Sequence, residues 1–310
     1  MPYSNNSFGK RLKKDLHKNW TLYLLFLPVI AYYIIFQYWP MYGIVTAFQE
    51  FNFTRGFFDQ QWANPWYRHF ARFLTGHFAW RTIRNTLLLN IYGLLWGWPL
   101  PIIFALLLNE VRNELFKRGV QTLSYLPHFI SAVVIGGMIR MFTGTNGLIN
   151  DIIVIFGGQR TNLLLFISNF RTIYIASGIW QGLGWGSIIY IAAIAGVSQE
   201  LYEAATIDGA KRFRKMWHVT LPGIKPTIII LLILNFGTLM SHGIERVLLI
   251  QEPATYEVSD IISTYVYRMG LMRMDFSFGT AVGFMNSLVN LITLITANQI
   301  AKKVTETSLW

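Results

Sequence analysis

The sequence predicts an all-α membrane protein with about six transmembrane helices, and three observations lead to this prediction. First, 53% of the 310 residues are hydrophobic and only 13% are charged, whereas a soluble domain carries about 25% charged residues. Second, six long stretches contain no Asp, Glu, Lys or Arg. Third, these stretches are continuously apolar, as in 227–234, whereas the strands of a membrane β-barrel alternate in polarity.

The composition also excludes several classes of protein. The high apolar content and the mean hydropathy of +0.39 exclude intrinsic disorder. The absence of cysteine excludes disulfides, thiolate nucleophiles and cysteine-ligated metal centres. The net charge of +11 would suggest nucleic-acid binding in a soluble protein. In a membrane protein it indicates cytoplasmic lysines and arginines, so we expect no nucleic-acid partner.

A helix needs about 20 apolar residues to cross a lipid bilayer. We expect the six spans at 20–39, 85–108, 119–139, 173–197, 226–243 and 279–300. They form one transmembrane domain over 20–300, after a basic cytoplasmic N-terminus at 1–19 and before a cytoplasmic tail at 301–310. The first span is expected to be retained, because no small-residue cleavage site of a signal peptide follows it.

The distribution of charge predicts that both termini lie in the cytoplasm. With the N-terminus inside, the cytoplasmic segments hold 15 of the 26 lysines and arginines in about 70 residues, and the outer segments hold 11 in about 115. This density follows the positive-inside rule. The first outer loop departs from it, because five arginines lie there. That loop is long enough to hold short elements of its own beside the membrane.

Three glycines of the fourth span recur every four residues, at Gly178, Gly182 and Gly186. Residues at this spacing share one helix face and let two backbones approach closely. The spacing therefore predicts helix packing along this stripe.

Aromatic and amide side chains within the spans are candidates for a solute path. Aromatic rings stack on the apolar faces of sugar rings, and amides bond to sugar hydroxyls. Our candidates are Trp180, Trp185, Tyr190, Asn235 and Asn286. The alternative is that the aromatic residues belong to interface belts and that the amides only bond to neighbouring helices. No Asp or Glu lies in the middle of a span, which disfavours an ion-coupled carrier.

The loop at 198–222, between the fourth and fifth spans, has the pattern of two short helices. Ser198 is a plausible N-cap for the first helix, and Gly209 provides a turn. Asp208 is placed to cap a second helix that begins near Ala210. A short helix with a small-residue face fits a groove on another protein, and the alternative is an amphipathic helix on the lipid surface.

This loop resembles a known family motif. Glu203-Ala204-Ala205, Gly209 four residues later, and the Val-Thr-Leu-Pro that ends at Pro222 resemble the EAA loop of ABC importer permeases. The resemblance extends over nearly the whole chain. Stretches such as RNTLLL (84–89), QTLSYLPHFIS (121–131) and TYEVSDIISTYVYR (255–268) look like the LplB-type branch of the maltose-permease-type carbohydrate importers.

The resemblance implies the fold and function of a type I ABC importer permease, similar to the maltose permease. Such a chain forms half of a pore for oligosaccharides or polysaccharide fragments in the bacterial plasma membrane. Its implied partners are a second homologous permease, two ABC ATPases and an extracellular solute-binding lipoprotein. ATP and Mg²⁺ would bind to the ATPases, because this chain has no phosphate-binding loop and is not itself an enzyme. The implied coupling residues are Glu203, Ala204, Ala205, Asp208, Gly209 and Ala210.

Three alternatives remain at the level of sequence. An ABC permease of this class could carry a solute other than a sugar. A stand-alone secondary carrier would need no ATPase. An intramembrane hydrolase would use Ser187 as the nucleophile and His128 or His242 as the base.

Overall fold

The computed structural model describes residues 15–56, 58–240, 243–305 and 308–309, so most of the predicted N-terminal segment 1–19 lies outside the described residues. The 3-10 and π helices are labelled η. The elements, in chain order, are α2 (Trp20–Tyr33), η1 (Ile34–Tyr38), α3 (Trp39–Met41), η2 (Tyr42–Phe48), β1 (Gln49–Glu50), β2 (Gln61–Trp62), α4 (Arg68–Leu74), α5 (Ala79–Gly97), α6 (Pro99–Asn109), α7 (Glu114–Tyr125), η3 (Leu126–Phe129), α8 (Ala132–Thr143), α9 (Leu148–Ile155), η4 (Leu163–Leu165), α10 (Ile167–Ala195), α11 (Gln199–Ile207), α12 (Arg212–Lys215), η5 (Met216–Thr220), α13 (Leu221–Gly237), α14 (Ile244–Ile250), η6 (Pro253–Thr255), α15 (Tyr256–Ser259), α16 (Ile262–Val266), η7 (Tyr267–Met272) and α17 (Phe276–Thr305).

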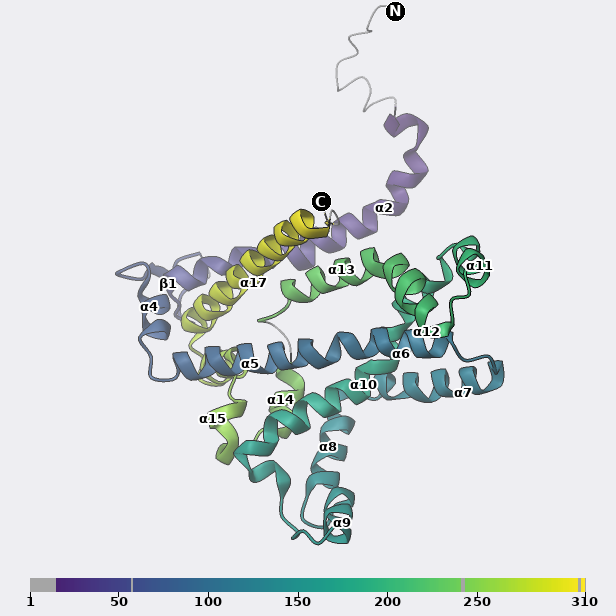
Figure 1. The fold of residues 1–310 in the computed structure, drawn as a ribbon. Helices are drawn as coiled ribbons and strands as arrows, with labels where there is room; N and C mark the ends of the chain where they lie inside the picture. Colours follow the sequence, from purple (N-terminus) through teal and green to yellow (C-terminus); the bar gives the residue numbers. More distant parts are fainter. Residues whose placement is uncertain (1–14, 57, 241–242, 306–307, 310) are drawn as a thin grey trace, which may run out of the picture.

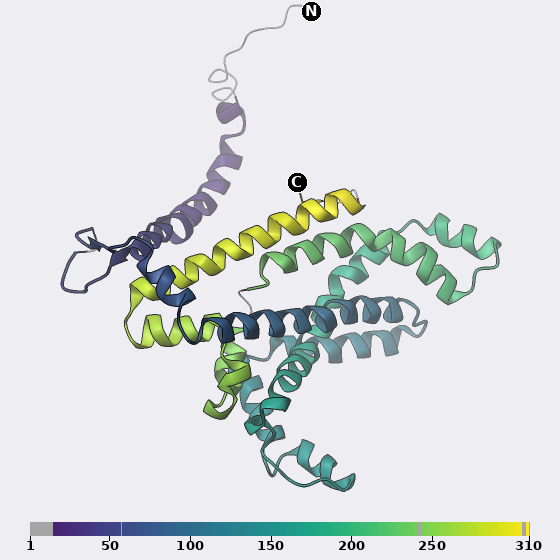
Figure 2. The same ribbon diagram turned by 60° about the vertical axis from the view of Figure 1, so that its left-hand side comes forward.

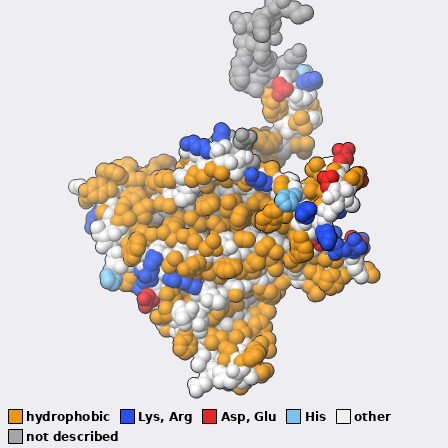
Figure 3. All heavy atoms as spheres, viewed as in Figure 1, with side chains coloured by type: hydrophobic (Ala, Val, Ile, Leu, Met, Phe, Trp, Pro, Cys, Tyr) orange, Lys and Arg blue, Asp and Glu red, His pale blue; other side chains and the backbone are white. Residues whose placement is uncertain are grey.

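Six helical stretches of the described chain are long and apolar enough to cross a membrane, which confirms the predicted number. They are Trp20–Phe48, Ala79–Asn109, Ala132–Ile155, Ile167–Ala195, Arg212–Gly237 and Phe276–Thr305. Hydrophobic side chains cover most of the face seen in Figure 3. A surface of this kind suits lipid and partner helices better than water.

The long helix α10 lies at the centre of the arrangement. It packs against α5, α6, α7 and α13, while α17 packs along α13 and against α4. Figures 1 and 2 show α5 and α6 running end to end and α13 beside α17. One hydrophobic core joins α6, α10 and α13 through Ile102, Ile194 and Ile224. By contrast, no side chain of α2 is buried, and its N-terminal end points away from the other helices in both views.

The predicted third span, 119–139, is not a single helix. Pro127 lies in the turn η3 between α7 and α8, and it has no amide hydrogen to continue a helical ladder. The hydroxyl oxygen of Ser131 then accepts a hydrogen bond from the amide of Val134 at 3.4 Å, which starts a new helix. The candidate span in this region is therefore Ala132–Ile155, towards the C-terminal side of the predicted one.

The predicted fifth span, 226–243, also differs, because the candidate span is Arg212–Gly237. The elements α12, η5 and α13 follow one another without a break. Pro226 lies inside α13 instead of marking the entry to the span. The π-helix η5 ends at Thr220, two residues before Pro222. Proline has no amide hydrogen, so a regular α-helix would lack one backbone hydrogen bond at Pro222.

The other four predicted spans overlap helices of the structure. The stretches 20–39, 85–108 and 279–300 lie inside candidate spans, and 173–197 runs two residues past the end of α10. The predicted tail 301–310 is partly helical, because α17 continues to Thr305. Beyond it, the amide of Leu309 donates to the Oδ1 of Asn298 at 2.8 Å, so this residue folds back onto α17.

The first outer loop holds short elements, as predicted. Strands β1 and β2 pair in antiparallel fashion, and α4 follows them. Three of the loop arginines form ion pairs: Arg68 with Glu50, Arg72 with Asp275 and Arg81 with Asp260. These carboxylates offset the positive charge that departs from the positive-inside rule.

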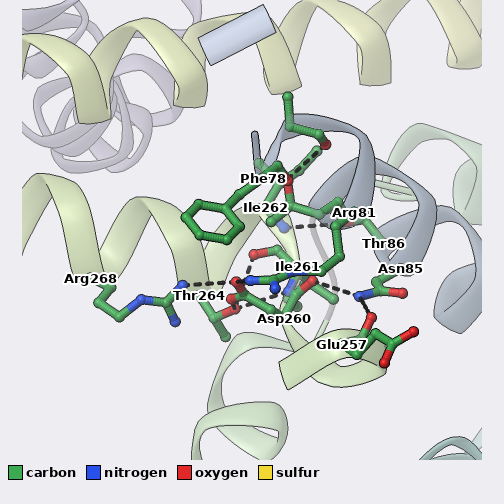
Figure 4. A network of polar contacts seen from close by, with 12 residues as sticks. Phe78, Arg81, Asn85, Thr86, Glu257, Asp260, Ile261, Ile262, Thr264 and Arg268 are labelled. Carbon is green, nitrogen blue, oxygen red and sulfur yellow. Dashed lines mark hydrogen bonds and ion pairs between the residues drawn. The ribbon is translucent and has the colours of Figure 1, made fainter. Parts of the chain in front are cut away.

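The Asp260 side chain is fully buried at the centre of a polar network (Figure 4). Its Oδ2 accepts hydrogen bonds from the guanidinium groups of Arg81 at 3.0 Å and Arg268 at 2.8 Å, and its Oδ1 accepts one from the hydroxyl of Thr264 at 3.0 Å. Burial alone would lower the pKa of Arg268, but the hydrogen bond and charge of Asp260 raise it above its ordinary value. The carboxylate is therefore neutralised from two sides.

The same network ties α5 to the segment that contains α15 and α16. The amide Nδ2 of Asn85 donates to the backbone carbonyls of Glu257 at 2.8 Å and Asp260 at 3.1 Å. The hydroxyl oxygen of Thr86 accepts a hydrogen bond from the amide of Ile262 at 2.9 Å. The contacts span more than 170 residues of sequence, and they fix α16 against the second span.

Replacing Asp260 by asparagine is expected to destabilise the protein by about 2–3 kcal/mol, because it leaves two arginines without a counter-ion. The side chains of Arg81 and Arg268 are 27% and 28% exposed, which lowers the cost from the value for a fully buried pair. The midpoint of thermal unfolding, followed by tryptophan fluorescence of the purified protein in detergent, measures the loss. The control is Asp151→Asn, whose ion pair with Arg160 is about half exposed. An equal shift in both variants would contradict the prediction.

Candidate functional site

A cavity of about 480 Å³ lies between α5, α6, α10, α13 and α14, within the usual size range of ligand pockets. Its wall is mostly apolar side chains and glycines. The polar groups are Asn90, Tyr174, Tyr190, Asn235 and Arg246. Asn90 and Asn235 each donate one amide hydrogen to a carbonyl of their own helix at 2.7 Å. Each amide keeps a second hydrogen and a carbonyl oxygen with which to meet a ligand.

Two of the five predicted solute-path residues, Tyr190 and Asn235, line this cavity. Trp180 lies two residues after Gly178, which faces the cavity, and therefore on the opposite side of α10. There it lines a second, almost wholly apolar cavity against α8.

Trp185 and Asn286 lie away from the cavity as well. The Trp185 ring stacks on His128 with the ring centres 4.4 Å apart. The Nδ2 of Asn286 donates to the backbone carbonyl of Met240 at 3.1 Å. This contact ties α17 to the segment that follows α13. A buried asparagine commonly has such a packing role.

The glycine stripe of α10 both lines the cavity and packs against neighbouring elements: a Cβ built on Gly186 would lie 3.3 Å from the Pro101 side chain of α6, and one on Gly178 would lie 2.5 Å from Arg246 of α14. A Cβ built on Gly182 would meet nothing within 4 Å, and Gly178 and Gly186 also line the cavity wall. The close approach of α10 to α7 occurs at Gly184, where a Cβ would lie 2.2 Å from the carbonyl oxygen of Ser124. The prediction of close packing along the stripe is therefore confirmed at Gly178 and Gly186, whereas Gly182 faces open space.

Arg246 reaches the cavity from α14, which lies outside the candidate spans. Its Nη2 donates to the Oε1 of Gln181 at 2.5 Å, and its Cζ lies 5.6 Å from the centre of the Tyr174 ring. Gly243 precedes α14 with a φ of 95°, and a Cβ there would lie 1.9 Å from the Tyr174 hydroxyl. Burial lowers the pKa of Arg246 while Tyr174 opposes that shift, and an arginine remains charged at neutral pH.

Arg246 is a candidate functional residue that the sequence did not predict. Charge-free stretches predict a fifth span at 226–243, which leaves Arg246 in an outer loop. The one pattern that could have found it is the stretch IERVLLI, 244–250, in which two charged residues interrupt an apolar run.

The predicted N-cap of the first loop helix is confirmed, and the predicted cap of the second is wrong. The hydroxyl oxygen of Ser198 accepts a hydrogen bond from the amide of Glu200 at 3.3 Å, at the start of α11. Helix α12 begins at Arg212 after Lys211, and no side chain caps it. Asp208 ends α11 instead, because three residues separate it from the next helix.

Helix α11 ends in a Schellman motif that requires the conformation of Gly209. The amide of Gly209 donates to the carbonyl of Thr206 at 3.0 Å, and the amide of Ala210 donates to that of Ala205 at 2.8 Å. Gly209 has a φ of 71°, a region that glycine adopts at little cost. The predicted turn at Gly209 is therefore confirmed.

Side-chain contacts fasten this loop to the fifth span. The Tyr202 hydroxyl and the Thr220 Oγ1 are 2.9 Å apart, and the Nζ of Lys215 donates to the Oγ1 of Thr206 at 2.8 Å. From Arg212 the chain continues as one helical rod of 26 residues, or about 39 Å. The rod carries Asn235, which lines the cavity, so one continuous helical stretch joins the end of the loop to the cavity wall.

The loop projects from the body of the protein and presents an exposed surface. No side chain of α11 is buried, and Leu201 and Ile207 are 53% and 88% exposed. Figure 1 shows α11 at one end of the molecule, where Figure 3 shows acidic side chains. The six predicted coupling residues, 203–205 and 208–210, all belong to this projection. Exposed apolar groups beside acidic ones suit a protein partner.

The arrangement expected of a serine hydrolase is not formed by the described residues. The Ser187 hydroxyl donates to the carbonyl of Gly184, in its own helix, at 2.6 Å. His128 stacks on Trp185, and no hydrogen bond joins Ser187 to a histidine in the part of the chain that the structure describes. His242 lies outside the described residues. Among the described residues, no group of three or more His, Cys, Asp or Glu side chains is placed to hold a metal ion.

Comparison with known proteins gives consistent matches over most of the chain. The model of the family described as "Binding-protein-dependent transport system inner membrane component" matches residues 97–306. The chain is 45% identical over 302 residues to the polygalacturonan/rhamnogalacturonan transport system permease protein YteP of Bacillus subtilis (strain 168), covering 97% of this chain and 94% of that one. It is 42% identical over 305 residues to the protein LplB of the same organism, covering 98% of this chain and 94% of that one.

Two solved structures also match over nearly the whole chain, with sequence identities close to those of the relatives above. The chain superposes with a TM-score of 0.87 and 39% identity on a chain of a bacterial alginate ABC transporter in complex with an alginate pentasaccharide-bound periplasmic protein. The match covers 96% of this chain and 100% of that chain. A second structure, of a bacterial ABC transporter involved in the import of the acidic polysaccharide alginate, matches with a TM-score of 0.86 and 39% identity over 95% of this chain and 99% of that one.

Proposed function

The chain belongs to the family of binding-protein-dependent transport system inner membrane components, and on this basis we propose that it is the permease subunit of an ATP-driven importer of oligosaccharides or polysaccharide fragments. It is a multi-pass membrane protein with the fold of a type I ABC importer permease. We place it in the bacterial plasma membrane, with both termini and α11 on the cytoplasmic side.

The cavity between α5, α10 and α13 supports a sugar-like solute. It combines apolar walls with amide, phenol and guanidinium groups, and polyhydroxylated rings need both kinds of contact. The relatives named for polygalacturonan, rhamnogalacturonan and alginate transport support the same class of solute. In this proposal the cavity forms one wall of the translocation path, and a second homologous permease forms the other.

The observation that carries the proposal is the continuous connection between the exposed α11 and the cavity. We place Glu203, Ala204 and Ala205 in a groove of an ABC ATPase, where Glu203 faces a basic residue and the two alanines allow close seating. Closure of the two ATPase subunits would move the loop, and the rod Arg212–Gly237 would transmit that movement to Asn235. ATP and Mg²⁺ bind to the ATPases, and an extracellular binding lipoprotein delivers the solute.

The experiment that tests this function starts with purification of the chain from its native membrane in a mild detergent, with all partners identified by mass spectrometry. We expect an ABC ATPase and a second permease with the same loop motif. The recovered complex is then placed in liposomes together with its binding protein, and uptake of labelled oligosaccharides is measured with and without ATP.

The outcomes separate the alternatives. ATP-dependent uptake of an oligosaccharide supports the proposal. ATP-dependent uptake of a different class of solute keeps the importer class but changes the substrate. Uptake by this chain alone, driven by an ion gradient, would establish a secondary carrier and overturn the proposal.

A further inference from the structure

Most arginines on the outer half of the molecule form an ion pair with a carboxylate, and Arg246 differs from them. Arg68, Arg72, Arg81, Arg140, Arg160 and Arg268 each form an ion pair with a carboxylate. Within the described residues Arg246 forms none, and its one hydrogen bond is to the neutral amide of Gln181. The cavity that it lines contains no Asp or Glu. No carboxylate of the described residues therefore forms an ion pair with it.

The surroundings of Arg246 hold its guanidinium in place with neutral groups. The Oε1 of Gln181 accepts the bond from Nη2 at 2.5 Å, and the Nε2 of Gln181 donates to the carbonyl of Ile130 at 3.3 Å, which fixes the amide. Nη1 lies close to Gly178, where a Cβ would approach it to 2.5 Å. The ring of Tyr174 lies beside the guanidinium group.

The remaining donors of Arg246 are available to a ligand. Nη1 and Nε donate to no group of the described residues, and the guanidinium fork matches the geometry of a carboxylate. An anion in the cavity would therefore replace water around a fixed charge, and it would meet no competing acidic side chain.

A second arginine, Arg171, lies on the face of α10 that lines the cavity, closer to the outer surface than Arg246. Arg171 lies seven residues before Gly178 on α10, and so on the same face and about 10.5 Å away along the axis. Its Nη2 donates to the Oδ1 of Asn85 at 3.1 Å, which is again a neutral partner. The positive charges therefore follow one face of α10 towards the cavity.

We infer that Arg246 is a specificity residue that binds the carboxylate of an acidic sugar, a uronate ring, inside the cavity. The inference rests on the proposed function, because it assumes that the cavity is part of the solute path. It predicts that this importer prefers uronate oligosaccharides to neutral ones of the same size and linkage. The acidic polysaccharide named for one matched transporter agrees with a solute of this class.

The test measures ATP-dependent uptake of two probes by the complete importer in liposomes. The probes are trigalacturonate and its carboxyl-reduced form, which has the same length and linkages but no charge. The binding protein also discriminates between the probes, but its contribution is the same in all variants and cancels when their preferences are compared. We expect Arg246→Gln to reduce trigalacturonate uptake about tenfold or more and to leave uptake of the neutral probe within about twofold.

Two further variants keep the test decisive. Gly178→Ala places a methyl group against Nη1 without changing the charge, and we expect it to lower the preference for trigalacturonate to an intermediate value. Arg160→Gln removes an exposed arginine far from the cavity, and it should leave the preference unchanged.

The outcomes distinguish the inference from the proposed function. An equal loss of uptake of both probes in Arg246→Gln would show that the arginine only supports the fold, and unchanged uptake of both probes would show that it does not meet the solute. Wild-type protein that takes up only the neutral probe would overturn the inference and leave the proposed function intact. Wild-type protein that takes up neither probe but takes up a neutral oligosaccharide would also overturn the inference alone, and failure to take up any labelled oligosaccharide would overturn both.

Discussion

Replacing Gly209 by valine is expected to abolish both solute uptake and the stimulation of ATP hydrolysis by the binding protein, while the chain still inserts in the membrane. Gly209 has a φ of 71°, and an L-residue with a branched Cβ adopts that region at a cost of about 1–2 kcal/mol. The two hydrogen bonds that end α11 depend on this turn. Without it, α11 leaves the orientation in which it meets an ATPase, and we expect uptake to fall by at least about tenfold.

The matched control is Gly209→Asn, because asparagine tolerates the left-handed region better than other residues. A Cβ at this position meets nothing within 4 Å, so neither variant is strained by contact of its Cβ, and we expect their difference to come from backbone preference. Uptake and ATP hydrolysis are measured in the reconstituted importer, and co-purification with the ATPase reports docking. We expect Gly209→Asn to keep most of its activity. Normal uptake by Gly209→Val would show that α11 does not carry the coupling.

The number of spans could be predicted from the sequence because the physical requirement is simple. A backbone in lipid must satisfy its own hydrogen bonds, and charged side chains are costly there, so long charge-free stretches become helices. The turn at Gly209 and the cap at Ser198 were also predictable, since both depend on residues that are adjacent in sequence.

The breaks within helices could not be predicted from local sequence. Pro127 ends one helix of the predicted third span, whereas Pro226 lies inside α13. A proline removes one amide hydrogen in both cases. Whether the chain then turns or continues depends on the surrounding packing. Ser131 starts a new helix after Pro127, while α13 is held along α17.

The identity of the cavity residues depends on how each helix is rotated about its axis, and the sequence of one helix does not specify this rotation. Tyr190 and Asn235 line the first cavity, but Trp180, which is on the same helix as Tyr190, lines the second. The sequence showed that small residues follow one face of α10. Only the structure shows that Gly182 leaves open space and that Gly184 forms the close contact. Arg246 was missed because it comes from a short helix between two spans.

Replacing Gly182 by phenylalanine is expected to give a transporter that hydrolyses ATP but moves little solute. Gly182 lies on the cavity wall, and a Cβ there meets nothing within 4 Å. The first side-chain atom therefore has room at this position, and we expect the ring of a phenylalanine to fill part of the 480 Å³. We expect Gly182→Phe to lower solute uptake by about tenfold or more. Binding-protein-stimulated ATP hydrolysis should continue, because the coupling loop is unchanged.

The number of solute molecules taken up per ATP hydrolysed is the measurement that separates this variant from Gly209→Val. Blocking the cavity lowers that ratio, whereas loss of coupling lowers uptake and hydrolysis together. The matched control is Gly137→Phe, which places the same side chain on the exposed face of α8, where a Cβ also meets nothing within 4 Å. It should leave the ratio unchanged. If Gly182→Phe transports solute normally, the path does not pass through this cavity, and the role inferred for Arg246 fails with it.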